Sequence, residues 1–372
     1  MGTASLALLI VGWLLGWLLG WALGWGLAGS RPVLPTADSA VPARLPAPRV
    51  SVVIPARNEV GRLPELLRCL AELDPAPGEV VVVDDESTDG TASLARAAGV
   101  RVIPSSPPPG WTGKAAACQR GADDSTGDVL VFLDADTAPA PGAVAALAAA
   151  ARGGELVSAH PRHRVERPYE YLSMGPAVVT VLAGGLGASP RWRWWRKPIA
   201  FGPAIAVRRD AYERFGGHAS VRGDLVEDLA LARAADRAGV PVRALLAGEQ
   251  ISYRMYPEGP RSLLHGWGRN LARGAGATPL PRLAATVVWV VAALHAGLVL
   301  AVDPRLLSLL CYAGFAVQFG AVARCVGRFR PVAAALHPLA LGAFVVLFCW
   351  SLVLVVHRRS VPWRGRRVEV GV

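Results

Sequence analysis

Two aspartates separated by one residue follow the most apolar strand-like run in the chain. In "VLVFLDADTAP" the run is 129–133 and the carboxylates are Asp134 and Asp136. At this spacing in an extended segment, both side chains project to one side and can chelate a hard divalent cation, which also offsets their repulsion. The alternative is structural: Asp134 begins a turn, and Asp136 or Thr137 caps the following helix. The pair is a candidate metal site.

A second acidic pair ends another apolar run. "VVVVDDESTDGT" places Asp84 and Asp85 after a row of valines. A carboxylate here can accept a hydrogen bond from a ribose hydroxyl or a base. The stretch also suits an Asx turn in which Ser87 or Thr88 caps the next helix. A helix cap needs only one polar side chain, so the additional acidic and hydroxyl residues in this stretch favour nucleotide recognition.

Two predicted helices begin with charged residues. In "GWTGKAAACQRGA" the dipole disfavours Lys114 at a helix start unless an anion is present, so we expect a phosphate or carboxylate partner. The alternative is a solvated lysine. In "VRGDLVEDLALARAADRAG", Asp224, Glu227 and Asp228 either complement the dipole or supply a general base.

Alternating strand and helix patterns must position these residues, and they predict a parallel sheet covered by helices. The predicted strands are "VSVVIP", "EVVVVDD", "VRVIP" and "DVLVFLD", and the predicted helices span 60–73, 88–98, 113–124 and 141–151. Ligands of such sheets bind beyond the carboxyl ends of the strands, so both acidic pairs are expected to face one crevice. No GxGxxG follows either strand, which disfavours a dinucleotide enzyme.

Apolar residues concentrate at the two ends of the 372-residue chain. Four uncharged segments approach the roughly 20 residues that span a bilayer; they are 5–28, 283–302, 306–323 and 332–356. The predicted order is an anchor (1–30), a Pro-rich linker (31–48), a globular domain (49–260), an interfacial amphipathic segment (261–282), about three transmembrane segments (283–356) and a basic tail (357–372).

A glycine stripe runs along the first apolar segment. Gly12, Gly16, Gly20 and Gly24 recur every fourth residue, which gives one helix face a groove suited to close packing on another helix. A low-complexity lipid anchor with no specific partner is the alternative.

The net charge of +11 points to anionic partners. Basic residues cluster beside the apolar segments and form no nucleic-acid motif, so we expect lipid and phosphate rather than nucleic acid. In "SPRWRWWRKP" the indoles alternate with cations, which suits the lipid headgroup layer, and a plain basic surface loop is the alternative. The five cysteines show no CxxC spacing, which disfavours a disulfide framework or a zinc site and fits a reducing cytosol.

Six motifs occur in a characteristic order: "VVIPARNE", "VVDDESTDGT", "GWTGKAAACQRGA", "FLDADT", "FGPAIAVRRDAYERFGGH" and "VEDLALAR". In these the chain resembles the membrane-associated family 2 glycosyltransferases, especially bacterial carotenoid (diaponeurosporenoate-type) and hopanoid-associated members, with which "YRMYPEG" and the terminal "WRGR" agree. The resemblance covers residues 50–275 and 363–366. It implies an α/β fold of the GT-A type, a Rossmann-like and mostly parallel sheet, with transmembrane helices at both ends.

The resemblance also implies a role for each matching residue. One departure is the family's QxxRW, because the aligned "LLHGW" retains only its tryptophan; a tail arginine is a candidate to compensate. The implied roles are nucleotide-sugar binding for Pro55, Glu59, Asp84, Asp85, Lys114 and Asp134, binding of Mg²⁺ or Mn²⁺ for Asp134 and Asp136, catalysis for Asp228 as base with Glu227 beside it, and an acceptor or membrane-side role for Trp267, Arg364 and Arg366.

The implied activity is inverting transfer of a sugar, predicted to be glucose from UDP-glucose, to a membrane-soluble lipid such as a carotenoid or other terpenoid. A carboxylic acid acceptor is already ionised at pH 7, so Asp228 would then orient it rather than take its proton. The alternatives are a polyprenyl-phosphate glycosyltransferase, a polysaccharide synthase or, outside enzymes, a small transporter with a nucleotide-binding domain.

We expect a multi-pass protein of the cell membrane with its catalytic domain in the cytosol. Three later spans would place the basic tail outside, against the positive-inside tendency. The last apolar segment carries His337 and Pro338 near its start, so it is a candidate for a re-entrant path that would keep the tail cytosolic. The oligomeric state stays open.

Overall fold

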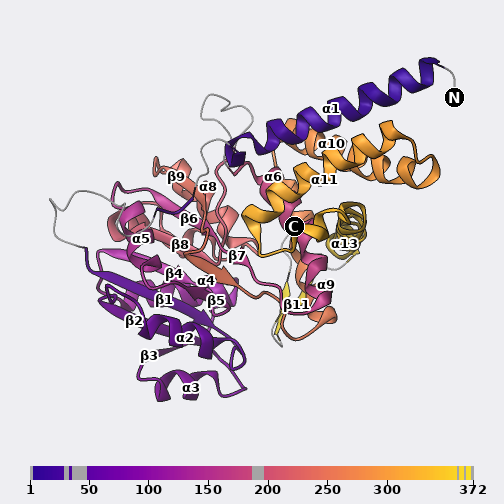
Figure 1. Cartoon of the computed structure of the whole chain (residues 1–372). Helices are drawn as coiled ribbons and strands as arrows, with labels where there is room; N and C mark the ends of the chain where they lie inside the picture. The colour runs from indigo at the N-terminus through magenta and orange to yellow at the C-terminus, as the bar shows by residue number, and fades with distance from the viewer. Residues whose placement is uncertain are drawn as a thin grey trace. The chain divides into compact units, whose positions relative to one another are not determined.

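The structure, a computed structural model, describes residues 3–28, 33–35, 48–186, 197–357, 360–363 and 366–369. Most of the predicted linker, most of "SPRWRWWRKP" and Arg364 lie outside the described residues. The chain divides into two compact units. One holds the large sheet with its helices, and the other holds the apolar helices (Figure 1).

Seven strands form the large sheet, in the order β3-β2-β1-β4-β8-β6-β9 (Figure 1). The four strands predicted from the sequence are parallel to one another, and β9 is parallel to β6. This confirms the mostly parallel sheet. The strands are β1 (Val50–Ala56), β2 (Glu79–Asp85), β3 (Arg101–Ser105), β4 (Val129–Leu133), β6 (Leu156–His160), β8 (Ala204–Arg208) and β9 (Val242–Leu246).

Helices cover both faces of this sheet. On β1, Val52 and Ile54 pack into one apolar cluster while Val53 packs into another, so the strand is buried on both sides and reads as a continuous apolar run. The first cluster includes residues of α2 (Leu63–Ala71), α3 (Thr91–Ala97) and α5 (Ala143–Ala150). The second includes residues of α4 (Gly113–Asp124), α7 (Arg209–Arg214) and α8 (Glu227–Arg237).

Strand β8 breaks the parallel pattern, because it runs antiparallel to both β4 and β6. It therefore begins at the edge where β4 ends, with Leu133 paired to Ala204. The residues just before β8 lie beside those just after β4, and Asp134 N donates to Pro203 O at 3.0 Å. The reversed strand thus brings residues distant in sequence to the edge that carries the acids.

Smaller elements complete the strand-rich part of the chain. β5 (Thr137–Pro139) and β10 (Ile251–Tyr253) pair antiparallel. The basic tail contains a two-stranded antiparallel sheet, which the sequence pattern does not predict. The remaining short elements are β7 (Arg162–His163), η4 (Gly217–Val221), β11 (Ser360–Trp363) and β12 (Arg366–Glu369).

Three helices of the second unit are long and apolar enough to cross a membrane. One is α13, an uninterrupted helix of 21 residues and so about 30 Å long, which is close to the thickness of a bilayer's hydrocarbon core. The re-entrant path considered above stays a prediction. The helices of this unit are α1 (Thr3–Ala28), η2 (Pro168–Ser173), α6 (Met174–Gly184), α9 (Pro260–Ala277), α10 (Leu280–Val302), α11 (Leu306–Val326), α12 (Pro331–Ala334) and α13 (His337–His357).

Segment 168–184 belongs to this unit although it lies inside the predicted domain 49–260. Its helix α6 is apolar along its length and mostly buried, and it packs on α11 and α13. Contacts with other apolar helices therefore decide its place, and the sequence pattern alone does not contain that information.

The glycine stripe of α1 has a specific partner within the same chain. An added Cβ at Gly16 would overlap Ala292 of α10, and one at Gly20 would overlap Trp289 of α10 and Gln318 of α11. The indole of Trp289 donates to Gln318 Oε1 at 2.6 Å beside this contact. The stripe is thus a packing groove, and the reading as an anchor without a partner is wrong.

Gly20→Ala should lower the thermal stability of the purified protein, whereas Gly12→Ala should not. Alanine raises helix propensity by up to about 1 kcal/mol at either site, but overpacking at Gly20 costs about 1–3 kcal/mol. An added Cβ at Gly12 meets no atom within 4 Å among the described residues. Melting temperatures in one detergent test this, and equal shifts in both variants would contradict the packing.

Candidate active site

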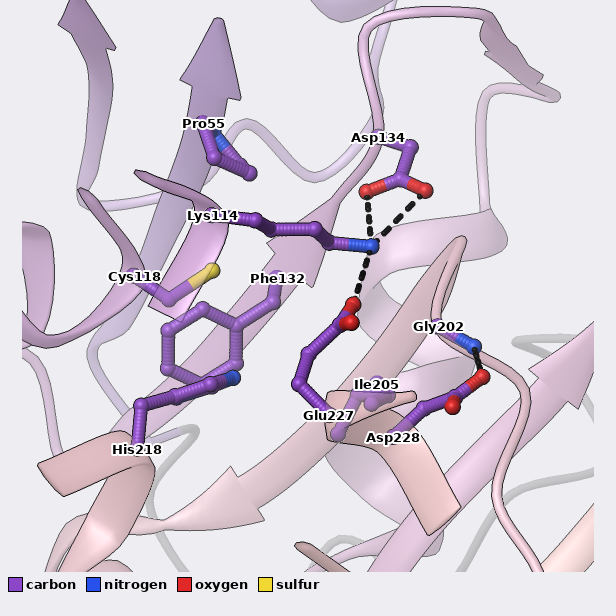
Figure 2. A pocket seen from close by; sticks show the side chains of 10 residues that line it. All are labelled: Pro55, Lys114, Cys118, Phe132, Asp134, Gly202, Ile205, His218, Glu227 and Asp228. Atoms are coloured by element: carbon purple, nitrogen blue, oxygen red, sulfur yellow. Dashed lines mark hydrogen bonds and ion pairs between the residues drawn. The ribbon is translucent and has the colours of Figure 1, made fainter. Parts of the chain in front are cut away.

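A small pocket lies at the carboxyl edge of the large sheet, between β1, β4, α4, α8 and the residues before β8 (Figure 2). Pro55 of β1 and Phe132 of β4 contribute apolar lining. The polar side chains that line it are Lys114, Cys118, Asp134, His218, Glu227 and Asp228.

The ammonium group of Lys114 lies between two carboxylates (Figure 2). Nζ is 2.8 Å from Asp134 Oδ1, 3.0 Å from Asp134 Oδ2 and 2.9 Å from Glu227 Oε1. Burial alone would lower the pKa of Lys114, but the two carboxylates outweigh it and raise the pKa well above its ordinary value. We expected an anion beside the lysine at this helix start, and in this structure the carboxylates of Asp134 and Glu227 take that place.

Asp228 has the properties of a general base. Its Oδ2 accepts a hydrogen bond from Gly202 N at 2.8 Å, and its Oδ1 accepts one from Leu229 N at 2.8 Å. Burial, followed by the negative charge of Glu227, raises the pKa of Asp228 to about 7. A carboxylate with this pKa is ready to take a proton near neutral pH.

Glu227 behaves differently although it is the adjacent residue. Burial would raise the pKa of Glu227, but its ion pair with Lys114 more than compensates and lowers it. The two acids at the start of α8 therefore divide into one that stays ionised and paired and one that titrates near neutrality. Such a separation of pKa values is typical of catalytic acid pairs.

Gly202 allows these groups to converge. A Cβ built there would lie 2.9 Å from Lys114 Nζ, 3.3 Å from Asp228 Oδ2 and 3.5 Å from Glu227 Oε1. A side chain at this position would displace the ammonium group. Residue type and spacing alone assign Gly202 no role; the available signal is a glycine between Phe201 and Pro203 directly before a strand-like run.

The DxD segment makes the predicted turn but not the predicted cap. Thr137 N donates to Asp134 O at 3.1 Å, so Asp134 does begin a turn. Helix α5, however, begins at Ala143 with Gly142 as its N-cap residue. The idea that Asp136 or Thr137 caps this helix is wrong, because β5 intervenes between the turn and the helix.

Asp136 lies near the guanidinium group of Arg62. Arg62 Nη1 is 3.9 Å from Asp136 Oδ2 and 3.8 Å from Glu59 Oε2. The two DxD aspartates therefore face different basic residues, Lys114 for Asp134 and Arg62 for Asp136.

The two DxD carboxylates suit a divalent cation that takes its remaining ligands from a substrate. Among the described residues, no group of three or more His, Cys, Asp or Glu side chains is placed to hold a metal ion. Mg²⁺ is commonly bound by only one or two carboxylates together with substrate phosphates. Asp134 and Asp136 match that incomplete protein contribution.

The second acidic pair ends β2, which is separated from β4 by strand β1. Asp85 is buried, and its Oδ2 is 3.9 Å from Arg57 Nη1. The Oδ1 atom of Asp84 is buried and accepts no hydrogen bond from any residue in the described part of the chain. Both pairs lie at one edge as predicted, but only the DxD pair contributes to the pocket, through Asp134.

The turn after β2 uses its hydroxyls differently from our expectation. Ser87 Oγ accepts from Asn58 N at 3.0 Å, and Thr88 N donates to Asn58 Oδ1 at 2.8 Å. Asp89 Oδ1 accepts from Thr91 N at the start of α3. The prediction that Ser87 or Thr88 caps this helix is wrong, because both bind the loop after β1.

Two other titratable groups of the pocket are unsuited to proton transfer at neutral pH. Burial lowers the pKa of His218 to about 3, so its ring is neutral, and Nδ1 lies 2.8 Å from Tyr212 Oη. Burial raises the pKa of the Cys118 thiol, which keeps it protonated. The reactive chemistry is left to Lys114 and the carboxylates.

Of the three predicted acceptor-side residues, Trp267 is the one whose side chain the structure describes. Trp267 belongs to the unit of apolar helices, where it is buried and its indole donates to Ser173 Oγ at 3.0 Å. Arg366 begins β12, but its side chain lies outside the described part of the structure, as does all of Arg364. Their acceptor role stays a prediction.

Comparison with known proteins gives this site a class. Residues 51–216 match the family model described as Glycosyl transferase family 2. Curated relatives match 86% of the chain at 31–32% identity. The chain therefore belongs to the family 2 glycosyltransferases, and its sheet with a DxD segment at the carboxyl edge is the GT-A fold.

Two such relatives carry one name. The 4,4'-diaponeurosporenoate glycosyltransferase of Staphylococcus haemolyticus is 31% identical over 334 residues, covering 86% of this chain and 88% of the relative. The protein of that name from Staphylococcus aureus strain MRSA252 is 32% identical over the same shares. These names confirm the predicted resemblance to the carotenoid type.

A solved structure shares the fold over nearly the whole chain. It is a mannosyltransferase from Pyrobaculum calidifontis in complex with GDP-Man and Mn²⁺, with a TM-score of 0.55 and 21% sequence identity. The likeness covers 94% of this chain and 96% of that one.

Proposed function

We propose that this glycosyltransferase moves glucose from UDP-glucose to a carotenoid acid of the diaponeurosporenoate type, by a metal-dependent single displacement with inversion. The observation that carries the proposal is the meeting, in one pocket, of the DxD carboxylate Asp134, the Lys114–Glu227 ion pair and Asp228 with a pKa of about 7. The names of the relatives support the acceptor class.

On the donor side, the DxD carboxylates would bind the diphosphate through Mg²⁺ or Mn²⁺. When bound, the cation neutralises charge that develops on the departing nucleoside diphosphate. The similar mannosyltransferase, solved with GDP-Man and Mn²⁺, is consistent with this role. Lys114 adjoins Asp134 and supplies a further positive charge on the same side.

For the nucleotide itself we propose Pro55, Glu59, Asp84 and Asp85. Pro55 lines the pocket, and Glu59 lies near Arg62, which also approaches the DxD segment. The buried Oδ1 of Asp84 would gain the most from a ribose or base donor, because a buried acceptor that lacks a hydrogen bond costs about 1–3 kcal/mol.

On the acceptor side, Asp228 acts on the attacking oxygen, which approaches the anomeric carbon from the face opposite the departing diphosphate. One displacement from that face inverts the anomeric configuration. An alcohol must lose its proton to Asp228, whereas a carboxylate is already ionised and needs only orientation. Glu227 keeps Lys114 in place and raises the pKa of its neighbour.

We place the protein in the cell membrane with its catalytic unit in the cytosol. Three apolar helices are long enough to cross a bilayer, and a terpenoid acceptor is soluble there. The relatives' names favour a carotenoid acceptor over a polyprenyl phosphate or a growing polysaccharide. Membership of a glycosyltransferase family leaves the transporter reading without support.

The test is release of UDP and formation of a glycolipid by the purified protein. With UDP-glucose and 4,4'-diaponeurosporenoate we expect both products only when Mg²⁺ or Mn²⁺ is present. Asp136→Asn should reduce the rate by about 100-fold, by weakening the cation's hold on the diphosphate. Asp74→Asn, at an exposed acid of the same unit, is the control. Unchanged turnover after chelation would refute metal dependence.

A further inference from the structure

Three residues just before β8, Phe201, Gly202 and Pro203, form a segment that we call the 201–203 bridge. Two acids from different elements bond to its backbone. Gly202 N donates to Asp228 Oδ2 at 2.8 Å, and Asp134 N donates to Pro203 O at 3.0 Å. The bridge therefore fixes the acceptor-side acid and the donor-side acid through consecutive residues.

The two ends of the bridge are held by different means. Pro203 adjoins the β4–β8 ladder, in which Leu133 pairs with Ala204, so the ladder itself fixes the contact with Asp134. Phe201 and Gly202 lie beyond the ladder, where β4 gives them no backbone partner in the paired register. Something else must hold the part that contacts Asp228.

Ser158 holds that part. It lies on β6 with 0% of its surface exposed. Its hydroxyl accepts a hydrogen bond from Phe201 N at 2.6 Å and donates one to Phe201 O at 3.0 Å, so one side chain satisfies both backbone polar groups of that residue. A buried hydroxyl in the apolar run "LVSAH" is costly unless it makes such bonds.

A second contact from the same strand supports the first. His160 is two residues beyond Ser158, so both side chains lie on one face of β6. Its ring meets that of Phe201 edge to face, with centroids 4.7 Å apart and planes at 88°. Phe201 is therefore held through both its backbone and its ring, from one strand.

We propose that Ser158 is a positioning residue for sugar transfer: by fixing Phe201, it holds Gly202 N where that group orients Asp228 toward the acceptor. The inference rests on the proposed function, in which Asp228 acts on the acceptor. Ser158 is not among the residues that line the pocket, so its effect passes through the bridge.

Three substitutions separate hydrogen bonding from packing. Ser158→Ala removes both bonds, Ser158→Cys nearly keeps the volume but bonds weakly, and Ser158→Thr keeps the hydroxyl while adding a methyl group. With an alcohol acceptor, we expect the Ala and Cys variants to lose about 10- to 100-fold in kcat, since small misplacements of catalytic groups have effects of this size. The KM for UDP-glucose should change less than about twofold, because the ladder still fixes Asp134.

The Thr variant should retain more activity than the other two. With an alcohol acceptor, the acid limb of the pH profile should also move to higher pH in the Ala and Cys variants, because the carboxylate of Asp228 loses a well-placed donor. The proposal would be overturned if the Cys variant had the kcat of the wild type and an acid limb at the same pH. Equal losses of kcat and melting temperature in all three variants would also overturn it, by showing a packing role.

Asp228→Asn, measured beside them, distinguishes the two hypotheses. If this variant is impaired with the alcohol while the Ser158 variants match wild type, only the positioning role fails. If Asp228→Asn is as active as wild type with the alcohol, the proposed role of Asp228 fails, whatever the Ser158 variants do.

Discussion

Asp228→Asn should lower kcat/KM by about 10³-fold with an alcohol acceptor and by less than about tenfold with a carboxylic acid acceptor. General bases contribute about 10²- to 10⁴-fold when the nucleophile must lose a proton. A carotenoid carboxylate has no such proton at pH 7, so only orientation is lost. The asparagine keeps the shape of the side chain and can still bond to the bridge.

The pH profile provides an independent reading of the same group. Since the pKa of Asp228 is about 7, its base form dominates only above that pH. With an alcohol acceptor, log kcat/KM should rise with unit slope up to about pH 7 and then level off. With a carboxylate acceptor no limb should appear near pH 7. Asp236→Asn, at an exposed acid on the same helix, should leave both profiles unchanged.

The sign of the stability effect follows from the same shift. A raised pKa means that the fold favours protonated Asp228, and this stabilisation is present below the unfolded-state pKa of about 3.9 and is lost as the pH rises through about 7. Asp228→Asn should therefore melt at or above the wild-type temperature at pH 8. An equal loss of activity with both acceptors, accompanied by a lower melting temperature, would contradict a role in catalysis.

Lys114→Met should reduce kcat/KM by about 10²- to 10³-fold with either acceptor. The ammonium group is the positive charge placed between Asp134 and Glu227, and losing one such electrostatic contact commonly has an effect of this size. Without it the pocket holds three carboxylates, which oppose the binding of a diphosphate. Calorimetry with UDP and Mn²⁺ should show weaker binding than in the wild type.

The same substitution should change the titration of the acid pair. Lys114 lowers the pKa of both Glu227 and Asp228, so without it the limb measured with an alcohol acceptor should move above pH 7. Lys197 is the other lysine of the chain and is exposed, so Lys197→Met is the matched control. Wild-type UDP affinity and an unmoved limb in Lys114→Met would remove Lys114 from the mechanism.

The elements that the sequence predicted well are those with strong local signals. Strands β1 to β4 and helices α2 to α5 follow from apolar runs alternating with helical patterns, because strands buried on both faces need continuous apolar residues. The start of α4 at Gly113 follows from local helix-start chemistry, with Thr112 Oγ accepting from Ala115 N. Such features depend on neighbours in sequence.

The helix caps show where local rules were insufficient. Ser87 and Thr88 have cap-forming side chains, yet both bind Asn58 from another loop. The groove of α1 was likewise readable as a pattern, but its occupants, Ala292 and Gln318, lie far along the chain. A hydroxyl or a glycine reveals a capacity for contact, whereas the partner depends on the fold.

The sequence by itself determined the alternating α/β architecture, the apolar helices and the acids at the carboxyl edge, since each is a matter of residue type and short-range spacing. Only the tertiary structure decided that β8 runs antiparallel between β4 and β6, and hence that Gly202 N bonds to Asp228 while Ser158 bonds to Phe201. It also decided which cation neutralises Asp134 and why two adjacent acids titrate differently. Burial and charge pairing depend on distances between residues remote in sequence, and those distances exist only once the chain has folded.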